Sequence, residues 1–464
     1  MELERVIAAL APRTVIARTP TEIVDLAYDA RAVTPGALFF CVPGSRADGH
    51  DFAADAVARG AVAVVVERKL ALPVPQLVVK DSRAAMAVAA DAFFGEPTRE
   101  LQVVGVTGTN GKTTTAFLLY AILAAAGRRP GLLGTIESRV GGERRPVVRT
   151  TPEAIDLQRA FREMLDAGDR SCAMEASSHA SELRRLDRVR FACLVFTNLS
   201  QDHLDFHGTM ERYFDAKRRL FVGDDRPPAA INVRDEWGRQ LAADRPDAIT
   251  FGFAPDAQVG PDALAGIDLK LRGRFNVENA LGALAASRII GIDDDAIVRG
   301  LESLRGVPGR FETVEEGQPF AVVVDYSHKP GALESVLQTA RELAAGRVIC
   351  VFGCGGDRDR EKRPLMGRIA SEQSDLAIVT SDNPRSEDPE AIITEILGGV
   401  AGDAEVEPDR RRAITRAIEE AREGDVVVIA GKGHEQGQEL ADRTIPFDDR
   451  EVARETLRRL GAAA

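Results

Sequence analysis

The most constraining feature of this chain is the segment TGTNGKTTT at residues 107–115. It follows the apolar run LQVVGV and precedes the helical stretch AFLLYAILAAAG. A strand that turns through glycines into a helix directs backbone N–H groups and a helix N-terminus at phosphate, and Lys112 adds a full positive charge. The hydroxyl of Thr113 stands where a Mg²⁺ ligand is expected. The segment therefore predicts a binding site for a nucleoside triphosphate.

The glycine spacing departs from the standard Walker A pattern, which has a glycine where this chain has Val106. One alternative is a glycine-containing turn between strand and helix that binds nothing. The sequence GKTT in a strand–turn–helix context favours the nucleotide site. The variant start, with Gly108 inside TGTNGKT, is typical of a group of ATP-using ligases rather than of small GTPases.

The length of 464 residues predicts two or three domains. A net charge of −12 argues against a nucleic-acid or anionic-membrane partner. No apolar run approaches the roughly 20 residues that span a bilayer, and the charged start MELERVIAAL does not resemble a signal peptide. The five scattered cysteines indicate reduced thiols. We therefore expect a cytoplasmic protein without membrane insertion.

The order of apolar strands and helical stretches predicts an α/β fold in three domains. Breaks occur at FFGEPTRE (93–100) and GVPGRFE (306–312), so we place the domains at 1–98, 99–308 and 309–464. Alternating buried strands and helices in the central and last parts predict mainly parallel sheets. Ligands bind such sheets at the carboxyl ends of the strands, and the polar motifs of this chain stand there.

Lysine is scarce in this chain, because only 8 of its 60 basic residues are lysine. Arginine serves as the general cation, so a lysine that remains is a candidate for chemistry that needs a primary amine or a point charge. Five of the eight lie in segments rich in glycine or histidine: Lys112, Lys217, Lys329, Lys362 and Lys432.

Three residues of the central part are candidates for the chemistry around the triphosphate. Glu175 ends the strand-like CAMEAS and suits a Mg²⁺ ligand, although a solvated carboxylate is the alternative. His203, in TNLSQDHLDFHG, is assigned to metal or phosphate, and a pair of core histidines with His207 is the alternative. Lys217, in DAKRRLF, is either a salt-bridged helix lysine or an amine that CO₂ converts to a carboxylate-like metal ligand.

Further strand ends supply candidates for binding the nucleoside and a second substrate. Asn276 is suited to a base edge and Asp325 to ribose hydroxyls, and each signal is weak alone. Three loops of the last domain, in GCGGDRDR, SDNPRSEDP and AGKGHEQ, are rich in charge. Together they could clamp a small zwitterion, with arginines on its carboxylates and acids on its ammonium groups. The residues of this clamp are Arg358, Asp382, Asn383, Arg385 and Glu435.

Ten motifs stand in the order found in the Mur ligases, so the chain resembles that family over nearly its whole length. They are TGTNGKTTT, EASSH, TNLSQDHLDFHG, DAKRRLF, GRFNVENA, GRFE, DYSHKP, GCGGDRDREKRPLMG, DNPR and AGKGHE. The resemblance implies a small N-terminal α/β domain that binds a UDP moiety, a central P-loop ATPase domain and a C-terminal Rossmann-like α/β domain for an amino acid. It also implies ATP and Mg²⁺ as cofactors, and we expect a monomer.

The resemblance assigns a role to each matching residue. Catalytic residues would be Lys112, Glu175, His203 and Lys217, with Lys217 carbamylated and with Thr113, Glu175 and His203 at the metal. ATP would be bound by Gly108, Thr109, Asn110, Gly111, Lys112, Thr113, Thr114, Asn276, Arg310 and Asp325. The UDP-linked substrate would be bound by Tyr28, Ala30, Ser45, Arg46, Ala47, Thr150, Thr151, Ser177 and Arg185. The amino acid would be bound by Arg358, Asp382, Asn383, Pro384, Arg385, Gly431 and Glu435.

The DNPR segment resembles the form in family members that add meso-diaminopimelate to UDP-N-acetylmuramoyl-L-alanyl-D-glutamate, through an acyl phosphate, in peptidoglycan precursor synthesis. Arg385, helped by Arg358, would pair with the second carboxylate of diaminopimelate. Three alternatives stay open: a member that adds L-lysine, a ligase for a different carboxylate, and a nucleotide-binding regulator without catalysis. Ala30, where the family usually has serine beside the uridine, favours the second of these.

Overall fold

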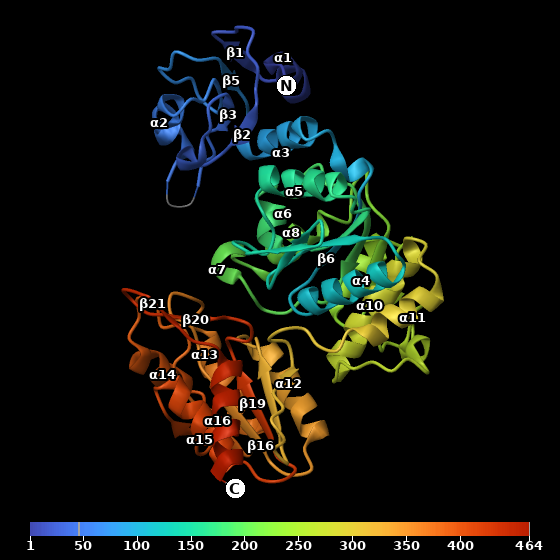
Figure 1. Cartoon of the computed structure of the whole chain (residues 1–464), viewed down its shortest axis with the longest axis vertical. Helices are drawn as coiled ribbons and strands as arrows, with labels where there is room; N and C mark the ends of the chain where they lie inside the picture. The colour runs from blue at the N-terminus through green and yellow to red at the C-terminus, as the bar shows by residue number, and fades with distance from the viewer. Residues whose placement is uncertain (45–46, 464) are drawn as a thin grey trace.

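The computed structural model describes residues 1–44 and 47–463, and it arranges three α/β units in a row along its longest axis (Figure 1). Their main sheets lie within residues 14–78, 102–251 and 312–430. The predicted fold class is confirmed, because the central sheet is mostly parallel and the last unit is Rossmann-like. The domain boundaries at 98/99 and 308/309 stay predictions. Among the described residues, no helix is long and apolar enough to cross a bilayer.

The N-terminal unit is a five-stranded sheet in the order β1-β5-β4-β3-β2, parallel except for β1. Its strands are β1 (Thr14–Ile16), β2 (Asp25–Ala27), β3 (Ala37–Phe40), β4 (Ala63–Val66) and β5 (Gln76–Val78). Its helices are α1 (Leu3–Leu10), α2 (Ala53–Ala58), α3 (Ser82–Phe93) and the 3₁₀ turns η1 (Ala30–Ala32) and η2 (Gly49–Phe52), with η3 (Pro97–Arg99) after them. Ala154 and Ile155 of the central unit complete this core, so the two units pack together.

The central unit is an eight-stranded sheet in the order β13-β12-β11-β6-β10-β7-β8-β9, antiparallel only at β8 and β9. Its strands are β6 (Gln102–Thr107), β7 (Pro130–Leu133), β8 (Ser138–Val140), β9 (Glu143–Arg145), β10 (Ser171–Glu175), β11 (Phe191–Phe196), β12 (Ala229–Asn232) and β13 (Ile249–Phe251). Its helices are α4 (Lys112–Ala125), α5 (Ala154–Asp166), α6 (Ser178–Glu182), α7 (Leu204–His207), α8 (Met210–Arg218), α9 (Glu236–Asp244), η4 (Pro261–Leu264), α10 (Arg274–Ile289) and α11 (Asp294–Ser303). One core cluster joins α4, α10 and α11 to this sheet.

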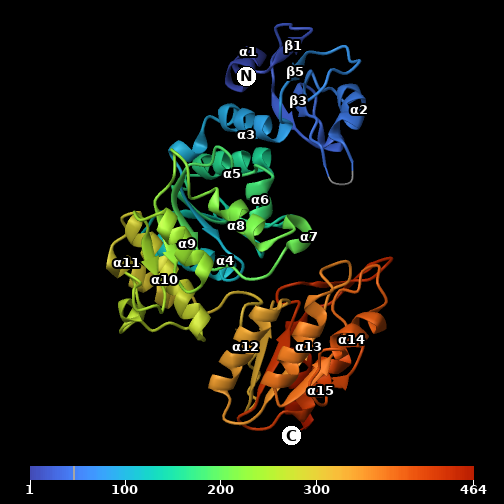
Figure 2. The same ribbon diagram turned by 180° about the vertical axis from the view of Figure 1, so that it is seen from behind.

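The C-terminal unit is a six-stranded sheet in the order β14-β15-β19-β16-β17-β18, parallel except for β14, with a separate hairpin β20–β21. Its strands are β14 (Glu312–Thr313), β15 (Ala321–Asp325), β16 (Val348–Phe352), β17 (Leu376–Val379), β18 (Glu405–Val406), β19 (Val426–Ala430), β20 (Gly437–Glu439) and β21 (Thr444–Pro446). Its helices are α12 (Pro330–Leu343), α13 (Lys362–Gln373), α14 (Pro389–Leu397), α15 (Arg410–Glu420) and α16 (Asp449–Ala463). The reverse view shows α12, α13 and α14 along one face of the sheet (Figure 2), and α15 and α16 pack together on the other face.

The strand order brings the polar motifs of the central unit together. Strand β6 lies between β10 and β11, and the three are parallel. The register pairs Glu175 with Val106 and Phe196 with Thr107, so all three strands end at the same level. The phosphate loop, Glu175 and the segment from Thr197 therefore leave the sheet side by side.

A buried ion pair fixes two helices of the C-terminal unit to its sheet. Arg410 opens α15, and its Nε and Nη2 donate to the two carboxylate oxygens of Asp449, at 2.7 Å each. Asp449 opens α16, and Arg410 also donates to the carbonyl of Ala430 at the end of β19, at 3.0 Å. Both side chains are fully buried, so the loss of one partner leaves an uncompensated charge in the interior.

We expect Asp449→Ala to lower the free energy of unfolding of this unit by about 3–5 kcal/mol, because it leaves the buried charge of Arg410 without a counter-charge. The matched control is Asp294→Ala, which removes an exposed ion pair with Arg288 and should cost less than about 1 kcal/mol. Thermal unfolding followed by circular dichroism, with hydrogen exchange of β19 to locate the loss, measures both. Equal effects of the two substitutions would contradict the prediction.

Candidate active site

The phosphate loop is a strand–turn–helix element whose two glycines are required by their surroundings. Gly108 has φ +144° and Gly111 has φ +85°, which are values that L side chains rarely adopt. A Cβ at Gly108 would collide with the hydroxyl of Thr197, and a Cβ at Gly111 would collide with the amide of Asn279. The loop can therefore approach its neighbours closely, and α4 begins directly at Lys112 with its N-terminus turned to the site.

Lys112 folds back over its own loop. Its Nζ donates to the carbonyls of Gly108 and Thr109, at 3.0 Å each. Burial lowers the pKa of the Lys112 amine to about 8, and the positive charge of Lys329 adds to this effect. An anion in the loop would oppose both influences and supply better acceptors than two carbonyls.

Thr113 and Glu175 form the oxygen pair that a magnesium ion would use. Thr113 Oγ1 donates to Glu175 Oε1 at 3.0 Å, and Glu175 also accepts from the backbone of Thr135 at 2.7 Å. Hydroxyl and carboxylate oxygens fit Mg²⁺, which keeps several waters and takes phosphate oxygens for its other positions. Within the described chain, no group of three or more His, Cys, Asp or Glu is arranged to hold a metal alone. The donor set therefore fits Mg²⁺ held together with phosphate.

His203 stands before α7 in the left-handed conformation, with φ +54°. Its Nε2 lies 2.9 Å from Asp202 Oδ2, and Lys329 Nζ lies 2.5 Å from the same oxygen. Although burial alone would raise it, Lys329 and His203 hold the pKa of Asp202 well below its usual range. Lys329 precedes α12, so this ion pair joins the C-terminal unit to the central unit at the site. His207, by contrast, is buried and lies 3.0 Å from the Ser178 hydroxyl.

Lys217 is buried on α8 and points at the phosphate loop. Its Nζ donates to the carbonyl of Gly108 at 3.0 Å and lies 4.7 Å from the ring centroid of Tyr213. Within the described residues no carboxylate forms an ion pair with it. Burial lowers the pKa of the Lys217 amine well below its usual value, and the charge of Lys112 contributes. Burial therefore favours the uncharged form of this amine, which lies against the phosphate loop and has no ion-pair partner among the described residues.

Arg310 reaches across from the C-terminal unit, and its Nη2 donates to Thr113 Oγ1 at 3.2 Å. Its guanidinium also lies 4.5 Å from the ring centroid of Tyr326. Asp325 ends β15 and accepts from the backbone of Phe311 at 2.7 Å, and burial raises the pKa of this carboxyl. Asn276 donates to the carbonyl of Arg272 at 2.7 Å, near the start of α10.

One cleft of about 1040 Å³ between the central and C-terminal units gathers many of the predicted residues. Those that line it are Thr109, Asn110, Gly111, Lys112, Thr113, Thr114, Thr150, Thr151, Glu175, Ser177, Arg185, His203, Lys217, Arg310, Asp325 and Arg358. Those outside its lining are Tyr28, Ala30, Ala47, Gly108, Asn276, Asp382, Asn383, Pro384, Arg385, Gly431 and Glu435. Ser45 and Arg46 lie outside the described residues.

The predicted substrate residues of the N-terminal and central units form local networks. Tyr28 donates to Asp156 of α5 at 2.7 Å, so it lies where the two units meet. Thr151 Oγ1 donates to the carbonyl of Glu175 at 2.8 Å, and Arg185 lies 2.9 Å from Glu153. Thr151 and Arg185 therefore continue the cleft from the phosphate loop towards the N-terminal unit.

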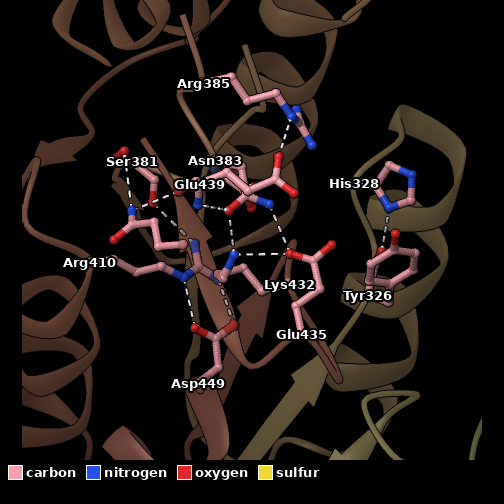
Figure 3. Close-up of polar contacts among 12 residues, drawn as sticks. Tyr326, His328, Ser381, Asn383, Arg385, Arg410, Lys432, Glu435, Glu439 and Asp449 are labelled. Carbon is pink, nitrogen blue, oxygen red and sulfur yellow. Dashed lines mark hydrogen bonds and ion pairs between the residues drawn. The ribbon is translucent and has the colours of Figure 1, made fainter. Parts of the chain in front are cut away.

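The loops of the C-terminal unit that were predicted to bind an amino acid form one connected network (Figure 3). Lys432 is buried, and its Nζ donates to Asn383 at 2.7 Å and to Glu435 at 2.9 Å. Asn383 also donates to Glu435 at 2.8 Å. Arg385 lies at the other end of the network, where its Nε donates to Glu439 at 2.6 Å. The figure shows Arg385, Glu439, Asn383, Lys432 and Glu435 in succession.

Several residues of these networks were not predicted as site residues from the sequence: Asp202, Lys329, Lys432 and Glu439. Two of them carried a signal, since Lys329 and Lys432 are among the few lysines of the chain. Asp202 lies inside the motif from which His203 was chosen, and its ion pair with Lys329 becomes visible only in the fold. Nothing in the sequence indicated a site role for Glu439, because it lies beyond the last motif on a short hairpin strand.

Three α/β units with a phosphate loop in the middle one define a multidomain phosphate-loop protein. Family models match the chain in all three units: "Mur ligase family, catalytic domain" at residues 22–104, "Mur ligase middle domain" at 106–287 and "Mur ligase, glutamate ligase domain" at 309–433. The chain therefore belongs to the Mur ligase family, which confirms the resemblance seen in its motifs.

Named relatives cover nearly the whole chain. UDP-N-acetylmuramoyl-L-alanyl-D-glutamate--2,6-diaminopimelate ligase of Solibacter usitatus is 50% identical, over 95% of this chain and 94% of its own. The protein of the same name from Geobacillus thermodenitrificans is 48% identical, over 94% and 95%. A solved structure of a UDP-N-acetylmuramoyl-L-alanyl-D-glutamate--2,6-diaminopimelate ligase has 33% identity and a TM-score of 0.68, over 96% of this chain and 97% of its own.

Proposed function

We propose that this chain is an ATP-dependent ligase that joins meso-diaminopimelate to UDP-N-acetylmuramoyl-L-alanyl-D-glutamate in peptidoglycan precursor synthesis. The observation that carries the proposal is that the central unit has a phosphate loop and the C-terminal unit has the Arg385 network. The names of the relatives at 50% and 48% identity support the choice of substrates. The proposal includes a monomeric enzyme in the cytoplasm, and the five free cysteines support a reducing compartment.

The first half-reaction transfers the γ-phosphoryl group of ATP to the free carboxylate of the D-glutamyl residue. ADP leaves, and an acyl phosphate forms. Lys112 would exchange its two loop carbonyls for phosphate oxygens, and the N-terminus of α4 would face the same charge. Arg310 would add a cation from the C-terminal unit, beside Thr113. These groups offset the repulsion between two anions, which is the main obstacle to this step.

Mg²⁺ held by Thr113 and Glu175 would neutralise further phosphate charge. His203 and a carbamylated Lys217 would hold or orient a second Mg²⁺. The carbamate forms when the neutral Lys217 amine adds to CO₂ and releases one proton. It would turn a buried base into an anionic oxygen ligand, which suits the absence of an acidic partner among the described residues. Asn276 and Asp325 would bind the adenosine, with Asp325 on the ribose hydroxyls.

The second half-reaction is the attack of an amine of diaminopimelate on the acyl carbon. The amide bond forms, the bond to the phosphate oxygen breaks, and inorganic phosphate leaves with the electron pair. Arg385 and Arg358 would pair with carboxylates of the amino acid, and Glu435 and Asp382 would face its ammonium groups. Asn383, Pro384 and Gly431 would shape the same pocket. Tyr28, Ala30, Ser45, Arg46, Ala47, Thr150, Thr151, Ser177 and Arg185 would hold the UDP-linked dipeptide.

We expect phosphate release from ATP to require both the UDP-linked dipeptide and an amino acid, with meso-diaminopimelate preferred over L-lysine by at least about a hundredfold in kcat/KM. The reason is that lysine lacks the distal carboxylate that would bind the free N–H groups of Arg385. Coupled phosphate release, with mass spectrometry of the product, measures this. Preference for lysine would overturn the amino-acid assignment. Turnover only with a non-UDP acceptor would overturn the acceptor assignment.

A further inference from the structure

Arg385 and Glu439 form an ion pair at the outer end of the C-terminal network (Figure 3). Arg385 follows β17 in the left-handed conformation, with φ +53°, and Glu439 ends β20. Their side chains meet at 2.6 Å through Arg385 Nε, and the backbone N–H of Arg385 donates to the carbonyl of Glu439 at 3.1 Å. Arg385 Nη1 also donates to the carbonyl of Gly356 at 2.8 Å. The pair is therefore held in place from three sides.

Each partner of this ion pair has hydrogen-bonding positions that the pair itself does not use. A guanidinium has five N–H donors and a carboxylate has about four acceptor positions, so one shared bond leaves most of them free. In the part of the chain that the structure describes, neither Arg385 Nη2 nor Glu439 Oε1 is engaged with another protein group. The side chains are 23% and 50% exposed, so both edges are accessible. A group that can bind an anion, Arg385, and a group that can bind a cation, Glu439, thus lie side by side.

The two other acids proposed to face ammonium groups, Glu435 and Asp382, lie deeper in the network and have surroundings that differ from those of Glu439. Glu435 Oε2 accepts from Lys432 at 2.9 Å and from Asn383 at 2.8 Å. Asp382 Oδ1 accepts from the backbone of Asn383, and its Oδ2 is buried and has no hydrogen-bond partner among the described residues. Glu439 differs because its counter-charge is Arg385 itself. When a ligand carboxylate takes the open edge of Arg385, Glu439 loses part of its compensation.

We infer that Glu439 is a specificity-determining residue that binds the ammonium on the same carbon as the carboxylate paired with Arg385. The inference rests on the proposed function, and it adds a second contact at the non-reacting end of the amino acid. At each end of diaminopimelate, a carboxylate and an ammonium are bonded to the same carbon. This arrangement matches the adjacent charges of Arg385 and Glu439. Arg385 thus distinguishes diaminopimelate from lysine, and Glu439 distinguishes it from a diacid that lacks the second amine.

The test compares meso-diaminopimelate with 2-aminopimelate, which has the same chain and both carboxylates but only one amine. We expect the wild-type enzyme to prefer meso-diaminopimelate in kcat/KM by about tenfold or more, since a hydrogen bond between charged groups is lost with the analogue. In Glu439→Gln this ratio should fall to within about threefold of unity, through a higher KM for meso-diaminopimelate, because the amide no longer offers a charge. The glutamine oxygen can still accept from Arg385.

The comparison separates ammonium binding from a role in positioning Arg385. If Glu439 only held Arg385 in place, Glu439→Gln would weaken both substrates equally, because both carry the distal carboxylate, and the unchanged ratio would overturn the inference. The matched control is Glu316→Gln, which breaks a carboxylate–arginine pair with Arg458 at the opposite edge of the sheet and should leave the ratio as in wild type. No phosphate release by the wild type with meso-diaminopimelate would instead overturn the proposed function itself.

Discussion

Replacing Lys217 by alanine is expected to lower kcat by about a hundred- to a thousandfold, the effect of removing one preorganised charge-stabilising group from a buried site. The physical basis is the environment of the amine. It is buried, its pKa is lowered by that burial and by Lys112, and no acid pairs with it in the described chain. These conditions favour the uncharged form of the amine, which is the form that adds to CO₂. The Lys217 carbamate would then supply the missing anion.

Rates in the presence and absence of bicarbonate measure the effect, and a short carboxylate such as acetate should partly restore activity to Lys217→Ala. Protein labelled with ¹³CO₂ should show a carbamate signal in ¹³C NMR spectra that the variant lacks. The control is Lys270→Ala, which removes an exposed lysine paired with Asp268 and should leave the rate unchanged. Full activity of Lys217→Ala, or no loss of wild-type activity after removal of CO₂, would contradict the proposal.

Arg385→Ala is expected to reduce kcat/KM for meso-diaminopimelate by about thirtyfold to several thousandfold. This factor corresponds to a loss of roughly 2–5 kcal/mol of transition-state stabilisation. The substrate carboxylate would be desolvated without its partner, and the Glu439 charge would also lose its counter-ion. L-Lysine lacks that carboxylate, so its smaller kcat/KM should change by less than about threefold. The two substrates should therefore become nearly equivalent.

Steady-state kinetics with both amino acids and constant ATP measures the change, and the KM for ATP should stay at the wild-type value. Arg385→Lys keeps the charge but not the planar fork, so it should recover only part of the loss. A proportional loss with both amino acids would show that Arg385 acts on folding or on the shared chemistry. In that case the carboxylate assignment would be wrong.

The parts of the candidate site that consist of neighbouring residues in the sequence could be predicted, because a short motif contains all of their functional groups. Gly108, Gly111, Lys112 and Thr113 belong to one turn and one helix start, and the close approach at both glycines agrees with the turn that was predicted. Glu175 stands at a strand end, and parallel strands bring such ends to one edge of a sheet. The order of the motifs predicted membership of the Mur ligase family, which the three matching domain models confirm.

The pairing of distant residues could not be predicted in the same way. Arg385 and Glu439 are 54 residues apart, and Arg410 and Asp449 are 39 apart. Each pair forms only because separate loops and helices pack at one edge of a sheet. The chain contains 60 basic and 72 acidic residues, so the sequence offers far more opposite-charge pairs than the fold brings into contact.

By itself, then, the sequence determined the fold class, the triphosphate loop and the family, because each depends on local backbone geometry or on the order of motifs. Only the tertiary structure decided which groups share a cleft and which remain outside it. It joined Lys329 of one unit to Asp202 of another, and it set Glu439 beside Arg385 with one oxygen open. The reason is physical: charge–charge contacts act over a few ångströms, and only the packing of the whole chain brings side chains that close.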